Sequence, residues 1–216
     1  MENVKKMVPW NEVANAVTHG FGTGLAVAAL VLLIVNASRY GNAWHIVSFS
    51  IYGASLVLLY LSSTLYHSFQ NKRVKHFLRI LDHSAVFLLI AGTYTPFTLV
   101  TLRGPLGWTL FWIIWGLAVA GVLFKAFFVD RYAVVSTIVY VVMGWLIVGS
   151  IKPLVQNLAP GGVILLIAGG ILYSAGIFFY ARTHNLFNHT IWHLFVLGGS
   201  ICHFFSVLYY VLPLPR

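Results

Sequence analysis

The sequence predicts an all-α protein that crosses a membrane seven times, and its composition and hydropathy pattern both support this. Of its 216 residues, 60% are hydrophobic and only 8% are charged. An average soluble domain has about 25% charged residues, so these residues could not build a water-facing surface. Apolar runs close to the roughly 20 residues that span a bilayer recur along the whole chain. Seven such spans account for nearly every residue, which predicts a single membrane domain over residues 1–216.

The seven expected spans are separated by short links that are polar or contain glycine and proline. Pro96 lies inside the third span and predicts a kink there, because proline cannot donate the helical backbone hydrogen bond. No internal repeat is apparent, which gives no support to an inverted-repeat transporter. The stretch Asn71–Arg79 is expected to be the longest basic link. The spans are expected near residues 17–36, 45–66, 81–101, 107–126, 133–150, 161–181 and 190–212.

Positive charge predicts the orientation of the bundle. With seven spans, the N-terminus and three of the links share one side, and that side carries nine lysines and arginines against four on the other. The positive-inside rule then places the N-terminus in the cytoplasm and the C-terminus outside. The net charge of +9 comes from scattered cations, which indicates anchoring at the membrane surface and no nucleic-acid partner. The nine are Lys5, Lys6, Lys72, Arg73, Lys75, Arg79, Lys125, Arg131 and Arg182, and the four are Arg39, Arg103, Lys152 and Arg216.

The same topology brings polar residues from four spans to one depth near the cytoplasmic face. Ionisable groups in apolar spans are costly, and they are therefore candidates for function. Of the four acidic residues, Glu12 and Asp82 fall at span ends where solvation alone does not explain them. Residues four apart share a helix face, so Ser63 points the same way as His67, and His189 points the same way as His193. The converging residues are Glu12, Asn15 and His19, the pair Ser63 and His67, Asp82 with His83, and the pair His189 and His193.

Three imidazoles beside a carboxylate predict a zinc site. We assign His67, His189 and His193 as ligands, because catalytic zinc commonly takes three protein ligands and leaves the fourth position to water. Zinc lowers the pKa of such a water to about 7. Asp82 is then the expected general base, and Ser63 is expected to orient the water or a substrate carbonyl. The alternative is that these histidines are only interfacial or packing residues.

A further set of polar residues is expected to support the ligands. Glu12, Asn15 and His19 would fix the tautomers and orientation of the histidines. His83 points about 100° away from Asp82 round the helix, so packing and support of the site both remain open for it. His203 lies about 15 Å deeper than His193 at 1.5 Å per residue, and it is expected to make a hydrogen bond between helices.

Four motifs together closely resemble the bacterial hemolysin III family. They are E-V-A-N-A-V-T-H from Glu12, S-T-L-Y-H from Ser63, the D-H at Asp82 with the later G-T-Y-T-P-F, and H-T-I-W-H from His189. This family is a branch of the progestin and adiponectin-Q receptor superfamily, which includes the adiponectin receptors. The resemblance extends from Glu12 to the last span. It implies seven helices in a bacterial cell membrane, a cytoplasmic N-terminus and a zinc ion near the cytoplasmic face.

The resemblance also implies site residues and a choice of functions. Three histidines matching His67, His189 and His193 would hold the zinc, with Ser63 and Asp82 beside it. Related receptors and the more distant alkaline ceramidases imply a zinc-dependent hydrolase of membrane lipid amides or esters. The alternatives are a non-enzymatic receptor or regulator of membrane lipids with structural zinc, and a pore-forming hemolysin. Membrane lipids are the expected partners. Nothing resembles the receptors' long N-terminal extension, so no protein hormone is expected.

Overall fold

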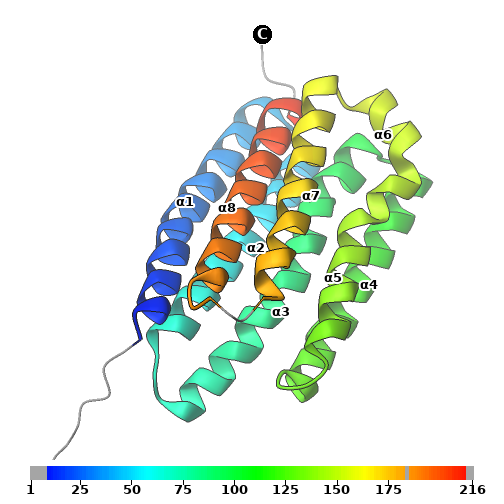
Figure 1. Ribbon diagram of the computed structural model, residues 1–216. Helices are drawn as coiled ribbons and strands as arrows, with labels where there is room; N and C mark the ends of the chain where they lie inside the picture. The colour runs from blue at the N-terminus through cyan, green and yellow to red at the C-terminus, as the bar shows by residue number, and fades with distance from the viewer. Residues whose placement is uncertain (1–8, 183–184, 213–216) are drawn as a thin grey trace, which may run out of the picture.

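The structure is a computed structural model that describes residues 9–182 and 185–212. Every regular element in these residues is helical, and seven helical spans are long and apolar enough to cross a membrane. The predicted seven-helix fold is therefore confirmed, and Figure 1 shows the helices side by side in one bundle. The helices are α1 (Trp10–Tyr40), α2 (Ala43–Ser68), α3 (Lys72–Pro96), α4 (Pro105–Phe128), α5 (Ala133–Trp145), α6 (Ile151–Asn157), α7 (Pro160–Tyr180) and α8 (Asn188–Ser206).

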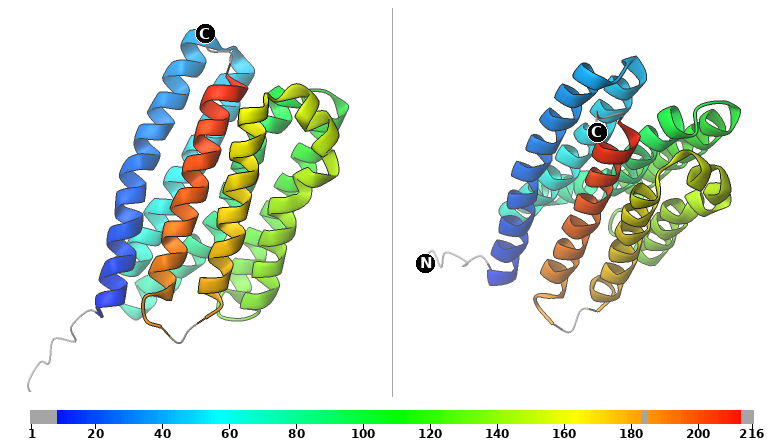
Figure 2. Two further views of the ribbon diagram at one scale, coloured as in Figure 1. Left: turned by 45° about the horizontal axis from the view of Figure 1, so that its top comes forward. Right: turned by 90° about the horizontal axis from the view of Figure 1, so that it is seen from above.

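Short links force consecutive spans to run in opposite directions. Helices α1, α3, α5 and α8 therefore begin at one end of the bundle, which we call the histidine end and which lies at the bottom of Figure 1. Seen from above, α1 and α2 lie at one side and α4 and α5 at the other (Figure 2). Which end faces the cytoplasm stays a prediction. Three of the residues counted for this orientation, Lys5, Lys6 and Arg216, lie outside the described residues.

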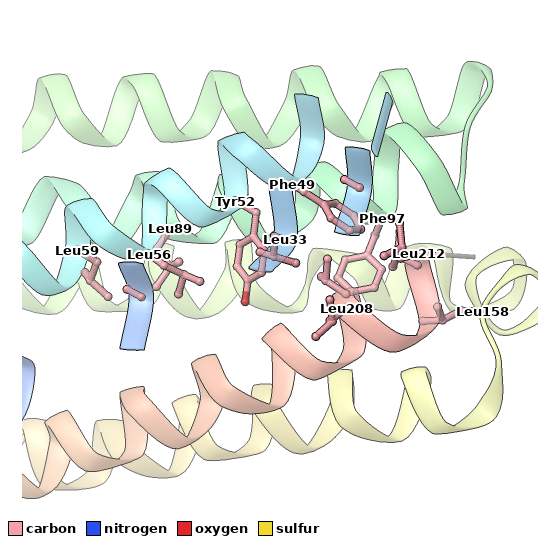
Figure 3. Close-up of a cluster of buried hydrophobic side chains, with 14 of the residues drawn as sticks. Leu33, Phe49, Tyr52, Leu56, Leu59, Leu89, Phe97, Leu158, Leu208 and Leu212 are labelled. Atoms are coloured by element: carbon pink, nitrogen blue, oxygen red, sulfur yellow. The ribbon is translucent and has the colours of Figure 1, made fainter. Parts of the chain in front are cut away.

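Helix α3 is the most buried of the spans. In its most apolar stretch 72% of the residues are buried, against 17% in α7. Its apolar side chains join those of α1, α2 and α8 in a core cluster, where Phe49, Phe97 and Leu208 meet (Figure 3). Because an apolar helix in lipid gains nothing by hiding apolar atoms alone, close packing must stabilise this arrangement. The central helix thereby fixes the depth of the polar residues at its first turns.

Helix α3 begins at Lys72, well before the expected span, so the prediction of a basic link over Asn71–Arg79 is wrong. The side-chain oxygen of Asn71 accepts hydrogen bonds from the backbone N–H groups of Arg73 (3.1 Å) and Val74 (3.3 Å). This N-cap satisfies donors that would otherwise be free. Lysine and arginine are also good helix formers. The helix therefore extends past the apolar stretch, and its basic turns stay connected to the bundle.

Pro96 ends the regular α-helical part of α3, as its lack of an N–H group predicts. A π-helical segment, Phe97–Thr101, continues the span. A second π-helical segment, Val207–Val211, ends the last span in the same way. Both segments lie at the end of the bundle opposite the histidine end.

The fifth span is broken, although the sequence predicted one continuous span. Helix α5 gives way to a 3₁₀ turn over Leu146–Ser150, and α6 follows. The Tyr94 hydroxyl of α3 lies 2.8 Å from the carbonyl oxygen of Met143 and accepts a hydrogen bond from the Ile147 N–H at 2.8 Å. Backbone groups without partners are costly inside a bilayer, so this hydroxyl makes the break tolerable. The sequence could not show it, because the partner lies on another helix.

Candidate metal centre

Three histidines meet at the histidine end of the bundle. His67 lies in the last turn of α2, and His189 and His193 lie in the first turns of α8. One ring nitrogen of each lies within 4.8 Å of the other two. The ring centroids are 5.1 Å apart for His67 and His189 and 4.6 Å apart for His189 and His193. A single ion placed between the rings can therefore reach a nitrogen of all three. No other such group occurs in residues 9–182 and 185–212.

The hydrogen bonds of these histidines show that they fit a zinc ion. His67 Nδ1 lies 2.9 Å from Glu12 Oε2. Because a carboxylate only accepts, Nδ1 carries the hydrogen and Nε2 keeps its lone pair. That Nε2 atom is buried without a partner, and so is His193 Nδ1. An unpaired buried nitrogen costs free energy, which a metal bond would offset. Three neutral imidazoles are a ligand set that zinc takes.

Residues of α1 lie around the three histidines. Asn15 accepts a hydrogen bond from the Thr190 hydroxyl at 2.6 Å, and its amide nitrogen lies 3.5 Å from His67 Nδ1. The His19 ring stacks on the His193 ring, with centroids 3.5 Å apart and planes 12° apart. Helix α1 therefore fixes the orientation of both α2 and α8 beside the site. The structure therefore brings Glu12, Asn15 and His19 together beside the three histidines.

Two contributors to the site were missed from the sequence. Lys75 lies 3.1 Å from Glu12 Oε2, so the carboxylate joins His67 to the first turn of α3. In the sequence Lys75 counted only toward membrane orientation. Thr190 occupies the position that glutamate holds in an H-E-x-x-H motif. Because Thr190 directly follows His189, the sequence could have indicated that it lies beside the site.

Asp82 and Ser63 line a cavity that also reaches His189 and His193. Ser63 is 1% exposed, and its hydroxyl oxygen has no hydrogen-bond partner in the described residues. Asp82 is half-buried. The carboxylate and the hydroxyl are close to each other, and both side chains line the cavity. His83 lines the cavity too, but it is not one of the three clustered histidines.

The cavity has a volume of about 200 Å³ and lies among α3, α5, α7 and α8. Its one carboxylate, Asp82, lies at the histidine end with His189 and His193, and most of its wall is apolar, including Leu89, Val141 and Ile167. Along α3 the lining extends from Asp82 to Phe97, roughly 22 Å at 1.5 Å per residue. His203 also lies on the wall, and its Nε2 is 3.0 Å from the Leu166 carbonyl oxygen. This is the hydrogen bond between helices that was expected.

Comparison with known proteins places these features in a family. The model of the family described as "Haemolysin-III related" matches residues 8–204. The chain belongs to this family. It is 58% identical to Hemolysin-3 of Bacillus cereus over 202 residues, which cover 94% of this chain and 92% of the relative. It is 55% identical to the Hemolysin-3 homolog of Bacillus subtilis (strain 168) over 204 residues, which cover 94% and 96%.

A more distant relative occurs in animals. The human monocyte to macrophage differentiation factor is 28% identical over 215 residues, which cover 95% of this chain and 87% of the relative. These matches extend over nearly the full length of the relatives. They confirm the resemblance inferred from the four motifs, and with the seven helical spans they make this member of the haemolysin-III-related family a multi-pass membrane protein.

Proposed function

We propose that this protein is a zinc-dependent hydrolase of membrane lipids that bear an amide or ester bond. The observation that carries the proposal is the convergence of three histidine nitrogens within 4.8 Å at the polar end of an otherwise apolar cavity. A structural metal needs only the ligands. Here a carboxylate and a hydroxyl line the same cavity as two of the three histidines, where they could act on a bound carbonyl compound.

The cavity supports a lipid as the substrate class. Its apolar wall runs along the bundle, parallel to the direction in which lipid chains lie in a bilayer. A hydrocarbon chain would bury apolar surface there, and it would bring a carbonyl group at its head to Asp82 and Ser63. Ligand sites are typically apolar with a few convergent polar groups, and this cavity has that character.

Each polar residue has a distinct part in the proposed reaction. His67, His189 and His193 would hold the zinc, which supplies a Lewis acid and lowers the pKa of a coordinated water to about 7. Asp82 would accept a proton from the attacking water and donate it to the leaving group. Ser63 would donate a hydrogen bond to the carbonyl oxygen of the substrate. Glu12 keeps the hydrogen of His67 on Nδ1, so that Nε2 stays available as a ligand.

Metal analysis and a lipid-hydrolysis screen test the proposal in sequence. Detergent-purified wild type should contain about one zinc per chain by elemental analysis, and a His189→Ala/His193→Ala variant should contain none. Wild type should then release fatty acid from a lipid amide or ester in a panel of such lipids. Asp82→Ala should keep its zinc and lose hydrolysis by at least the 10²-fold that general acid–base catalysis typically contributes.

Two results would contradict the proposal. A wild-type protein prepared without chelators and free of metal would remove the site. A protein that retains zinc but hydrolyses none of the lipids would make the ion structural. The name of the Bacillus cereus relative attributes hemolysis to that protein, so dye leakage from liposomes should be measured in parallel. Leakage that chelation does not change would indicate pore formation instead.

A further inference from the structure

A cluster of three hydroxyl groups lies deeper in the bundle than the metal centre. The Tyr60 hydroxyl of α2 donates a hydrogen bond to Ser200 Oγ of α8 at 2.8 Å, and the Tyr173 hydroxyl of α7 lies 2.7 Å from the same oxygen. We call these three residues the hydroxyl cluster. Tyr60 precedes His67 by seven residues and Ser200 follows His193 by seven, so the cluster lies about 10.5 Å from the histidines along the helices.

Glycines in α7 and α8 make room for the ring of Tyr173 and for that of its neighbour His203. A Cβ atom on Gly199 would lie 2.8 Å from Cε2 of Tyr173, and a Cβ atom on Gly169 would collide with the His203 ring. The centroids of the Tyr173 and His203 rings are 5.4 Å apart. Because side chains packed this closely have little freedom to move, the Tyr173 hydroxyl is held at one depth of the bundle.

The hydroxyl cluster reaches the cavity through Tyr173. Tyr60 and Ser200 are buried and do not line the cavity. Tyr173 is half-buried and is part of the cavity wall, as are the metal-centre residues His189 and His193. A molecule that extends from the histidine end along the cavity therefore passes this tyrosine.

The cluster holds one hydroxyl hydrogen more than its own contacts use. Each of the three hydroxyls carries one hydrogen, and the two contacts at Ser200 Oγ use two of them. The Val196 carbonyl oxygen lies 3.4 Å from the Tyr60 oxygen, beyond the usual range for an O–H donor. With Tyr60 donating to Ser200 and Ser200 donating to Tyr173, the hydrogen of Tyr173 has no acceptor in the described residues.

The other hydroxyls of the cavity wall, apart from Ser63 and Tyr180 at the histidine end, are bonded to the backbone. Each donates its hydrogen to a carbonyl oxygen of the chain. They belong to Thr93, Tyr94, Thr137, Tyr140 and Ser174. Within the described residues, Tyr173 is therefore the wall residue beyond the histidine end that can donate a hydroxyl hydrogen to a bound molecule.

We propose that the cavity selects an acyl chain that carries a hydroxyl group part-way along its length, and that Tyr173 donates a hydrogen bond to this group. The inference rests on the proposed function, because it takes the carbonyl end of the chain to lie at the histidine end. An extended covalent chain advances about 1.2 Å per bond, so the depth of the cluster corresponds to roughly nine bonds from the carbonyl carbon. An unsubstituted chain would leave the Tyr173 donor buried without an acceptor, which costs free energy.

Competition for a bound fluorescent fatty acid on the detergent-purified protein tests this site. The competitors are two stearates of equal polarity, with a hydroxyl group on the tenth carbon or on the seventeenth. Wild type should bind the first about fivefold more tightly, the usual contribution of one hydrogen bond. Tyr173→Phe removes only the hydroxyl and should abolish this preference. Tyr140→Phe is the matched control, because its hydroxyl lines the same cavity but already donates to the His83 carbonyl at 2.7 Å.

Equal binding of the two stearates by wild type would overturn the proposal, and this comparison needs no variant to fold. A preference that persists in Tyr173→Phe, or that is lost equally in Tyr140→Phe, would overturn it as well. Free fatty acids contain no amide or ester bond, so the result does not depend on turnover. A protein that keeps the preference but hydrolyses no lipid contradicts only the hydrolase, and one that hydrolyses lipids without the preference contradicts only this inference.

Discussion

A single hydrogen bond selects the nitrogen of His67 that can bind a metal. Glu12 Oε2 lies 2.9 Å from Nδ1, and the same oxygen lies 3.1 Å from Lys75 Nζ. The carboxylate therefore orients the ring, and Nε2 is buried without a hydrogen-bond partner in the described residues. Such outer hydrogen bonds orient metal-binding histidines and raise their basicity.

Replacing Glu12 by glutamine should therefore weaken zinc binding without removing a ligand. Glutamine can present its NH₂ group to Nδ1, which would favour the wrong tautomer. We expect zinc affinity to fall about 10- to 100-fold, as is typical when an outer partner is lost. Competition with a chelator of known affinity measures this.

Lys75→Gln is the matched control for Glu12→Gln. It removes the lysine that contacts the same carboxylate but leaves the bond to His67. Its zinc affinity should stay within a few fold of wild type. Equal losses in the two variants would mean that charge at this edge matters and that the hydrogen bond to His67 does not.

Helices α2 and α3 approach so closely that a methyl group does not fit between them. A Cβ atom on Gly92 would lie 2.2 Å from Ser55 Oγ and 2.8 Å from Ser55 Cβ. The hydroxyl can rotate away, but the Cβ atom moves only with the backbone. Small residues at such contacts let membrane helices pack, and this contact holds α3 in the depth that brings Asp82 beside Ser63.

Gly92→Ala should destabilise the bundle by about 1–3 kcal/mol, the usual cost of overpacking. The midpoint of thermal unfolding in detergent measures this loss. Gly92→Ala/Ser55→Gly should recover part of it, because the two nearest atoms are removed. Gly116→Ala in α4 serves as control, since nothing lies within 4 Å of its Cβ position. A drop of equal size in Gly116→Ala would show that the effect does not come from the contact with Ser55.

The sequence predicted that the three histidines lie close together, because this depends on little more than helix direction and spacing. Once seven spans alternate in direction, His67 and His189 must share a depth, and His193 follows His189 on the same face. The rotation of each helix about its own axis could not be predicted in the same way. Spans that are apolar all round carry no stripe that marks the inner face. The stacking of His19, the burial of Lys125 and the break supported by Tyr94 therefore depend on partners that only the folded bundle shows.

Charge across the full bundle bears on which side of the membrane holds the site. Among the described residues, seven lysines and arginines lie near the histidine end and three near the opposite end. The histidine end therefore carries more lysines and arginines than the opposite end even when only the described residues are counted. The positive-inside rule counts such residues in short links and near span ends, and it predicts that the histidine end faces the cytoplasm.

Labelling of single cysteines should show this orientation directly. In a Cys202→Ser background, Arg73→Cys probes the histidine end and Lys152→Cys the opposite end, and both positions are exposed. A membrane-impermeant maleimide applied to intact cells should label Lys152→Cys at once and Arg73→Cys only after permeabilisation, because positive charge is retained on the cytoplasmic side. The reverse pattern would place the histidines outside, where the proposed hydrolase would draw its zinc and lipid from the outer leaflet.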